Sequence, residues 1–254
     1  MKQLDGKSIF VTGAAGGIGT LVCQRLRAAG AHVTGIDRIA CPAADVTIVT
    51  DLSDQAALSQ LGAHLAVQHV DMLVNIAGFQ YFGPMERQAA DNIWLGYAIN
   101  LIAPATLIAA VLPQMQARNS GQIVNLGSVM GAINCPYFAA YSSSKAGLKG
   151  LSEALRREVH GRGIAVTHTA PRAVRTAFNN GDVNRFMAMT GMAADSPEHV
   201  ADRIVKAIAG RKKDVVFGGK ESLFTRLNAL FPRVVDAGLA GQTAKASTMF
   251  LPTG

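Results

Sequence analysis

Short apolar runs of strand length alternate with longer segments of helical periodicity, and this order constrains the fold more than any other feature of the chain. Because the runs are almost continuously apolar, the sheet that they form must be covered on both faces. Repeated β-α-β order with such strands indicates an α/β fold with a parallel, doubly wound sheet. We expect about seven strands, at SIFVT (8–12), HVTGI (32–36), VTIVT (46–50), MLVNIA (72–77), QIVNLG (122–127), IAVTHT (164–169) and DVVFG (214–218).

Helical segments separate most of these runs. The segment at 20–30 ends on a glycine of the kind that often closes a helix, and the segment at 53–68 opens on Ser53, a capping residue. The chain contains no linker, internal repeat or shift in composition. We therefore expect one domain over residues 1–254, with a helical tail at 221–254.

The composition excludes a disordered chain and does not favour nucleic-acid binding. Hydrophobic residues make up 49% of the chain and charged residues 16%, so a large core can be buried. The net charge is +7, but the basic residues are spread along the chain. Their densest cluster, Arg211 to Lys213, has no interleaved aromatic residue that could stack on a base, and we interpret it as solvated surface.

The cysteines and the N-terminus favour a reducing compartment. Three cysteines are an odd number without CxxC spacing, so neither a disulfide framework nor a metal site is expected at Cys23, Cys41 and Cys135. Asp5 and Lys7 lie where an export signal needs an apolar core. We expect a cytoplasmic protein.

The first strand leads directly into a glycine-rich loop, TGAAGGIGT (12–20), and then into a helix. Gly13, Gly17 and Gly19 leave the backbone free of side chains, so a pyrophosphate can approach the helix N-terminus, where unpaired N–H groups favour an anion. Glycine clusters also occur in ordinary turns, but the position after the first strand favours nucleotide binding.

Asp37 lies at the end of the second strand, 18 residues after Gly19. This is close to the spacing at which a carboxylate accepts hydrogen bonds from the adenosine ribose, and the same carboxylate would repel a 2′-phosphate. We therefore expect NAD rather than NADP. Arg38 keeps NADP open, because a guanidinium could hold the phosphate if Asp37 turned away.

Several separated motifs follow in order. The glycine loop has the spacing TGxxxGxG, NIAG occupies 75–78, Ser128 ends the fifth strand and YSSSK follows thirteen residues later at 141–145. In this combination the chain resembles the short-chain dehydrogenase/reductase family in its short, single-domain form, over roughly residues 5–218. The resemblance implies a Rossmann-like fold and a catalytic tetrad of Asn100, Ser128, Tyr141 and Lys145.

The chemistry of these side chains suits those roles. A carbonyl that accepts hydride needs a proton, which the Tyr141 phenol can supply if its pKa falls from roughly 10 toward neutrality. Lys145 lies one helical turn away, where its ammonium stabilises the phenolate, and Ser128 can hydrogen-bond the substrate oxygen. Asn100 could relay protons through a water to Lys145, and without the resemblance it would be a helix-packing amide. Residues 142–144 have no assigned role beyond small, packable filler.

The resemblance also implies a set of cofactor contacts. Asp51 and Leu52 would flank the adenine, and small residues after the fourth strand would allow close approach of the backbone. Asp51 could instead cap the following helix, although Ser53 suits that role better. The implied set is Gly13, Gly17, Ile18, Gly19, Asp37, Asp51, Leu52, Asn75, Ala77, Gly78, Tyr141, Lys145, Pro171, Val174 and Thr176.

The segment after the sixth strand departs from the family pattern. It reads APRAVRT, with Arg172 in the usual glycine position, while Pro171, Val174 and Thr176 still match. Either the backbone has ordinary angles here or strain is stored. We expect Arg172 to be a partly exposed side chain at the rim of the cleft, with a contact to the pyrophosphate or to an acidic substrate as the alternative.

Two apolar segments raise the question of membrane contact. The run at 101–113 holds two prolines and is too short to span a bilayer, so we expect a buried helix. The segment 221–235 could dock on its own domain, on another subunit or on a membrane surface. We expect packing on protein and do not favour the membrane. The apolar face of that segment consists of Leu223, Leu227, Leu230 and Phe231, with Lys220, Arg226 and Arg233 nearby.

Flexible and aromatic side chains indicate an apolar substrate pocket. One wall would come from residues 79–82 and 130–138, and these side chains could equally form the core of a mobile lid. Cys135 is expected as pocket lining or packing. The second wall would comprise Phe178, Phe186, Met187, Met189 and Met192.

These observations predict an NAD(H)-dependent oxidoreductase that interconverts a hydrophobic secondary alcohol and its ketone, with Tyr141 as general acid or base. The alternatives are a 3-oxoacyl-thioester-type reductase using NADPH and a non-catalytic nucleotide-binding sensor. By the resemblance, we expect a homodimer or homotetramer joined through residues 92–117 and 140–160.

Overall fold

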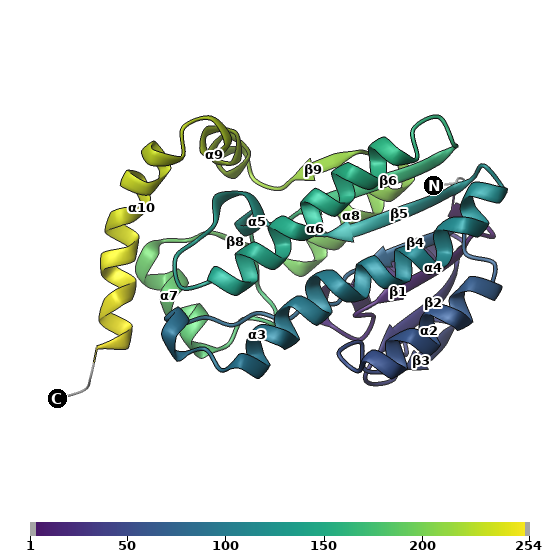
Figure 1. The fold of residues 1–254 in the computed structure, drawn as a ribbon, viewed down its shortest axis with the longest axis horizontal. Coiled ribbons are helices and arrows are strands. Elements are labelled where there is room, and N and C mark those ends of the chain that lie inside the picture. Colours follow the sequence, from purple (N-terminus) through teal and green to yellow (C-terminus); the bar gives the residue numbers. More distant parts are fainter. Residues whose placement is uncertain (1–3, 252–254) are drawn as a thin grey trace.

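A seven-stranded parallel sheet forms the centre of the structure, a computed structural model that describes residues 4–251 (Figure 1). Its strand order is β3-β2-β1-β4-β5-β6-β9, and all neighbouring strands in it are parallel, which confirms the predicted sheet. The order reverses between β1 and β4, where a doubly wound sheet opens a crevice. The strands are β1 Ser8–Thr12, β2 His32–Asp37, β3 Val46–Val49, β4 Met72–Asn75, β5 Gly121–Leu126, β6 Ile164–Ala170 and β9 Asp214–Val216.

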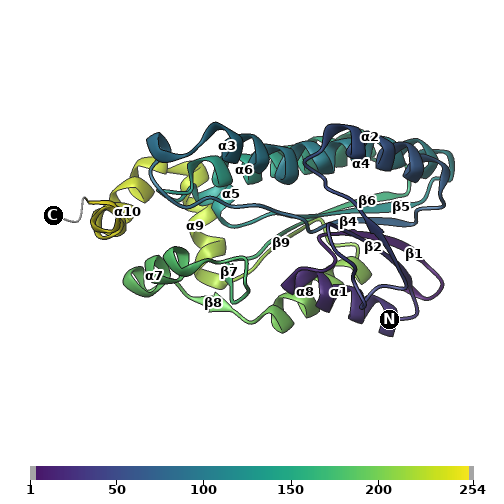
Figure 2. The same ribbon diagram turned by 90° about the horizontal axis from the view of Figure 1, so that it is seen from below.

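Helices cover both faces of the sheet in two layers (Figure 2). One layer packs α1 on α8, and the other packs α2 on α4 with α6 beside them. Each layer closes its own apolar core against the sheet, and this explains the almost continuous apolar character of β4 and β5. The layers comprise α1 Gly17–Ala28 and α8 Pro197–Ala209 on one face, and α2 Gln55–Val67, α4 Ala103–Ala117 and α6 Ala139–Glu158 on the other.

The predicted buried helix at 101–113 belongs to a longer helical stretch. It comprises α3 Ala90–Tyr97, the π-helical turn η3 Ala98–Ile102 and α4. By length and composition alone Ala90–Ala117 could cross a membrane, so the expectation that this segment is too short is wrong. The core helix of a soluble protein passes the same test, and α4 contributes Leu107 and Val111 to the core between helices and sheet.

A smaller apolar cluster lies beyond the carboxyl ends of the strands. It brings together the loop after β4, the start of α6, α7 and the end of the chain. The ring of Phe82 lies at its centre, 4.8 Å from Phe138, 5.1 Å from Phe186 and 5.4 Å from Phe250 between centroids. The remaining elements of this region are η2 Met85–Arg87, α5 Met130–Ile133, the paired strands β7 Ala173–Val174 and β8 Ala194–Asp195, and α7 Gly181–Thr190.

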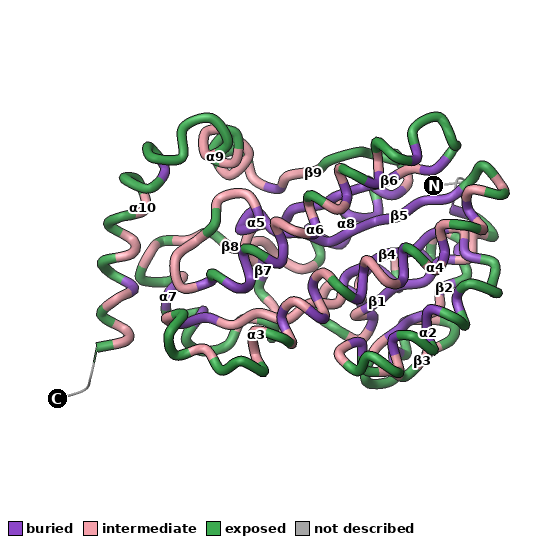
Figure 3. The backbone as a smooth tube through the Cα atoms, viewed as in Figure 1, coloured by how far each residue is buried: buried purple, intermediate pink, exposed green. Residues whose placement is uncertain are grey.

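The tail forms two helices and a short 3-10 turn: α9 Gly219–Leu230, α10 Pro232–Ser247 and η4 Thr248–Phe250. The single helical face expected over 221–235 is therefore wrong, because Phe231 leaves the helix and Pro232 starts a new one. α9 contacts α5, and α10 contacts α7. The outer sides of both helices stay exposed (Figure 3).

Candidate active site

A cleft of about 1200 Å³ runs along the carboxyl ends of the strands. The glycine loop and Asp37 line it at one end, and Tyr141 and side chains of α7 line it at the other. Crevices at this edge of an open α/β sheet are where such folds bind ligands. The cleft is therefore the candidate site.

Three glycines of the loop at one end of the cleft have no room for a side chain. Gly13 has φ 68°, and a Cβ there would lie 2.6 Å from the backbone nitrogen of Ala77. A Cβ on Gly19 would lie 2.0 Å from the carbonyl oxygen of Gly13. A Cβ on Gly17 would lie 2.9 Å from Cγ2 of Thr176, across the cleft. The result is a strip of bare backbone at the start of α1, the arrangement that suits a pyrophosphate.

Two carboxylates, those of Asp37 and Asp51, line the cleft near the glycine loop. Asp37 Oδ2 accepts a hydrogen bond from the backbone N–H of Ala15 at 2.9 Å, which fixes the carboxylate beside the loop. Asp51 accepts from the hydroxyl of Ser53 at 2.7 Å and from its N–H at 2.8 Å, and these bonds lower the pKa of Asp51. The expected capping role of Ser53 is wrong, because Asp54 caps α2 through the N–H groups of residues 56 and 57.

The residues assigned to the cofactor fit a dinucleotide as a group. All of them line the cleft except Asn75. Asn75 is buried below the cleft, where its amide donates to Oδ1 of Asn125 at 2.8 Å and ties β4 to β5. It supports the site from beneath and does not face the cleft.

Ser128, Tyr141 and Lys145 all line the cleft. Tyr141 and Lys145 lie one turn apart in α6, and Lys145 Nζ is 5.9 Å from the centroid of the Tyr141 ring. Lys145 Nζ donates to the carbonyl oxygen of Leu126 at 2.9 Å. Gly131 lets α5 approach this turn, because a Cβ there would lie 2.7 Å from the carbonyl carbon of Lys145. Tyr141 therefore has Ser128 as a hydrogen-bond partner and the Lys145 ammonium beside its ring, and all three side chains face the cleft.

Burial shifts both titrating groups toward their neutral forms. It raises the pKa of Tyr141 to about 12, and a hydrogen bond with Ser128 acts in the opposite direction. It lowers the pKa of Lys145 to about 8. In the free protein, then, Tyr141 does not show the lowered pKa expected from the sequence, because desolvation outweighs the hydrogen bond with Ser128. A neutral phenol is the form that can donate a proton.

Asn100 lies behind the cleft in the π-helical turn and is fully buried. Its Oδ1 accepts from the N–H of Phe79 at 2.9 Å, and its Nδ2 donates to the Phe79 carbonyl at 2.8 Å and to Ser144 Oγ at 2.9 Å. Both amide hydrogens are therefore used by the protein. The side chain fixes the loop after β4, and the structure shows no free donor on it for the expected relay.

The serines between Tyr141 and Lys145 are not simple filler. Ser144 accepts from Asn100 and donates to the carbonyl of Tyr141 at 2.8 Å, which links two members of the expected tetrad. Ser143 bonds the hydroxyl of Tyr97 at 2.6 Å. No local sequence signal could show these pairings, because the partners lie more than 40 residues apart.

The substrate end of the cleft is lined by apolar side chains. Of the expected residues, Phe178, Met187 and Met192 line it, whereas Phe186 is only 1% exposed and belongs to the aromatic cluster. Cys135 lines the cleft, as expected, and burial raises the pKa of its thiol to about 11, which disfavours the thiolate form. The sequence did not indicate the contribution of the tail, which adds Lys220, Phe224, Leu239 and Gln242.

Arg172 ties three elements together at the edge of the cleft. Its Nη2 lies 2.7 Å from Asp195 of β8, and its Nη1 lies 3.3 Å from Glu221 in the first turn of α9. Its φ is not positive, so the backbone has ordinary angles. It is partly exposed and lines the cleft, as expected, and the structure adds that both carboxylates engage its guanidinium.

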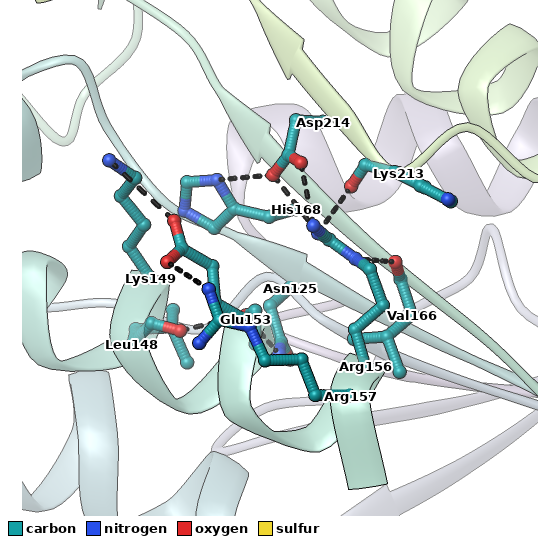
Figure 4. A network of polar contacts seen from close by, with 11 residues as sticks. Asn125, Leu148, Lys149, Glu153, Arg156, Arg157, Val166, His168, Lys213 and Asp214 are labelled. Atoms are coloured by element: carbon teal, nitrogen blue, oxygen red, sulfur yellow. Dashed lines mark hydrogen bonds and ion pairs between the residues drawn. The ribbon is translucent and has the colours of Figure 1, made fainter. Parts of the chain in front are cut away.

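The sequence also did not indicate a buried histidine in β6, the strand beside β5 (Figure 4). His168 of β6 packs against Gly127, where a Cβ would lie 2.1 Å from His168 Nε2. Its Nδ1 is 4.0 Å from Asp214, which Arg156 holds with two bonds of 2.7 and 3.0 Å. Burial lowers the pKa of His168 to about 4, so the imidazole is neutral at pH 7.

Comparisons with known proteins agree with this geometry. The profile of the short chain dehydrogenase family matches residues 7–185. The chain is 31% identical to dehydrogenase/reductase SDR family member 7B of Danio rerio, over 96% of this chain and 89% of that protein.

Solved structures show the same fold. A short-chain dehydrogenase from Streptomyces avermitilis superposes with a TM-score of 0.77 at 29% identity, over 93% of this chain and 96% of that one. A short chain dehydrogenase from Burkholderia cenocepacia in complex with NADP gives a TM-score of 0.79 at 20% identity, over 93% and 99%. The chain belongs to the short-chain dehydrogenase/reductase family and is an NAD(P)-dependent oxidoreductase.

Proposed function

We propose that the protein interconverts an apolar secondary alcohol and its ketone, with Tyr141 as the proton donor and acceptor. The observation that carries this proposal is that Ser128 and Lys145 both lie beside Tyr141 in a cleft that is apolar on its far side. A protein that only binds nucleotides has no need of the three groups together.

The roles of the side chains follow from their protonation states. When bound, the nicotinamide ring delivers or accepts the hydride at the substrate carbon. For ketone reduction, the neutral phenol of Tyr141 donates its proton to the carbonyl oxygen, and Ser128 hydrogen-bonds the same oxygen as charge develops on it. The ammonium of Lys145 stabilises the phenolate that remains.

The pH dependence of reduction follows from Lys145. Its pKa is about 8, so the ammonium is present below that pH and lost above it, while Tyr141, with a pKa of about 12, keeps its proton throughout. The rate of reduction should therefore fall as the pH rises through about 8.

The cofactor that we propose is NAD(H) in preference to NADP(H). The support is Asp37, whose carboxylate is held beside the glycine loop by Ala15 N–H, where a 2′-phosphate would meet a like charge. Arg38 contributes to lowering the pKa of Asp51, so its charge lies near a second carboxylate. Calorimetric titration with NADH and NADPH tests the preference, and tighter binding of NADPH contradicts it.

A screen of secondary alcohols and ketones with both cofactors, monitored by the absorbance of the reduced nicotinamide, tests the reaction. We expect turnover of apolar substrates with NADH. Turnover of 3-oxoacyl thioesters with NADPH alone would favour the thioester reductase, and cofactor binding without any turnover would favour a sensor.

We further propose that the protein assembles as a homodimer or homotetramer through the long helical stretch and α6. The support is two apolar side chains that the single chain leaves exposed on the long helical stretch, Trp94 at 60% and Ile102 at 39% exposure. Light scattering of the purified protein gives the mass directly, and a monomer at micromolar concentration contradicts the proposal.

A further inference from the structure

We propose that the corner between α9 and α10 is a docking surface for an anionic membrane. The corner consists of the outer side of α9 together with residues 231–234. No residue of α9 is buried, although the helix carries four large apolar side chains. Leu223 is 66% exposed, Leu230 72%, Phe231 57% and Val234 57%.

The apolar side chains are regularly spaced in the sequence of the corner. Leu223, Leu227 and Leu230 follow the spacing of one helical face, and Phe231 and Val234 continue the patch across the break before α10. The corner protrudes at one end of the molecule, away from the sheet (Figures 1 and 3). A projecting amphipathic helix of this kind can bury its apolar side chains at the lipid headgroup level.

The charges beside the patch match anionic lipid. Lys220, Arg226 and Arg233 are exposed, and none of them forms an ion pair among the described residues 4–251. Of the two nearby acids, Glu221 is already bound to Arg172, which leaves Asp236. Basic residues at the edge of an inserted apolar surface attract anionic headgroups.

The same charges disfavour a second copy of this chain on the patch. A two-fold interface would place the arginine-bearing surface against itself, without an acidic surface to oppose it. A bilayer surface supplies both the apolar layer and the negative charge.

The docking surface is also the outer wall of the substrate cleft. Phe224 of α9 and Leu239 and Gln242 of α10 line the cleft, while neighbouring residues of the same helices form the patch. Phe224 is itself 41% exposed and joins the two. Docking would place the cleft next to the bilayer, where an apolar ketone dissolves. This link, but not the binding itself, rests on the proposed function.

Co-sedimentation with vesicles tests the docking. We expect the wild-type protein to bind vesicles of phosphatidylcholine mixed with phosphatidylglycerol more tightly than vesicles of phosphatidylcholine alone. The double variant Leu230→Gln/Val234→Gln should bind both kinds of vesicle at least about tenfold more weakly, because it lacks two apolar side chains that docking would bury in the bilayer. Arg226→Gln/Arg233→Gln should lose about fivefold per arginine on the anionic vesicles only.

Two matched controls separate the corner from general effects. Val67→Gln removes an apolar side chain that is 80% exposed on α2, and Lys212→Gln removes an exposed cation from the basic cluster 211–213. Both should bind as the wild type does. Equal losses in the controls, no binding of the wild type to either vesicle, or a change of oligomeric mass in the Leu230/Val234 variant without a change in vesicle binding would overturn the proposal. Activity on a water-soluble ketone should stay unchanged in all variants, so a failure of docking is distinguishable from a failure of the proposed reaction.

Discussion

The two ends of the cleft are built in different ways. At the cofactor end the wall is bare backbone, where added Cβ atoms would collide with Ala77 and Gly13 at 2.6 and 2.0 Å. At the substrate end the wall consists of side chains, among them those of α7, α9 and α10, and no residue of α9 is buried. The first end has one shape fixed by steric exclusion, whereas the second can adapt because little packing holds it.

Burial follows the same division. Every residue of β4 and β5, which carry the catalytic and cofactor loops, is buried (Figure 3). In α10 only Val235 and Ala246 are buried. We call the sheet with its cofactor and catalytic loops the rigid half, and the region of α9 and α10 the loosely packed half. The difference in burial indicates that the rigid half holds the cofactor and the catalytic groups and that the loosely packed half determines the choice of substrate.

The largest expected effect belongs to the rigid half. Tyr141→Phe removes the proton donor but keeps the ring, so turnover should fall by about 10²–10⁴ while the dissociation constant for NADH changes little. Steady-state rates and calorimetry measure the two quantities. Wild-type turnover in the variant would contradict the assigned role, and lost cofactor binding would show that the ring itself shapes the cofactor site.

A pair of leucine substitutions compares the packing of the two halves directly. Leu73→Ala in β4 removes a fully buried side chain and should lower the free energy of unfolding by about 2–5 kcal/mol. Leu230→Ala, at a site 72% exposed, should change it by less than about 0.5 kcal/mol. Urea unfolding gives both values. Similar losses in the two variants would mean that α9 is covered in solution.

The buried histidine gives the rigid half a pH dependence. Burial lowers the pKa of His168 from 6.5 to about 4, so between these values the unfolded chain binds a proton that the folded chain does not. Stability should therefore fall as the pH drops through this window, by up to about 3 kcal/mol.

His168→Gln should reduce that fall, and His64→Gln, at an exposed site on α2, should not. Urea unfolding at several pH values between 7 and 4 measures the difference. Equal pH dependence in the wild type and in His168→Gln would show that other groups cause the acid sensitivity.

The smallest effect concerns cofactor choice. Asp37→Ala should raise the affinity for NADPH relative to NADH by about tenfold, because one like charge near a 2′-phosphate is removed. Arg38→Ala is the matched control and should shift the ratio the other way or not at all. Calorimetry with both cofactors measures the ratio, and an unchanged ratio in Asp37→Ala would remove Asp37 from the cofactor site.

Local signals were enough to predict the rigid half. Strand periodicity, the glycine loop and the spacing of Tyr141 and Lys145 lie within short stretches of sequence, and the sheet and the cleft follow them. The break between α9 and α10 also had a local signal in Pro232, which the apolar periodicity of 221–235 obscured.

Features that depend on distant contacts could not be predicted. Ser144 and Asn100 lie 44 residues apart, and Arg172 meets partners 23 and 49 residues away. The pKa of Tyr141 depends on its burial, and a sequence pattern gives the residue but not its solvation. The sequence could place Arg172 at the rim of the cleft but could not give its partners Asp195 and Glu221.

The transfer of deuterium from NADH labelled at the nicotinamide C4 position tests the central claim most directly. The wild-type protein should reduce an apolar ketone to an alcohol that carries one deuterium on the carbinol carbon, detected by mass spectrometry, and Tyr141→Phe should form the same product far more slowly. Unlabelled alcohol, or no product from any ketone while the cofactor binds, would contradict the account of this protein as a hydride-transferring oxidoreductase.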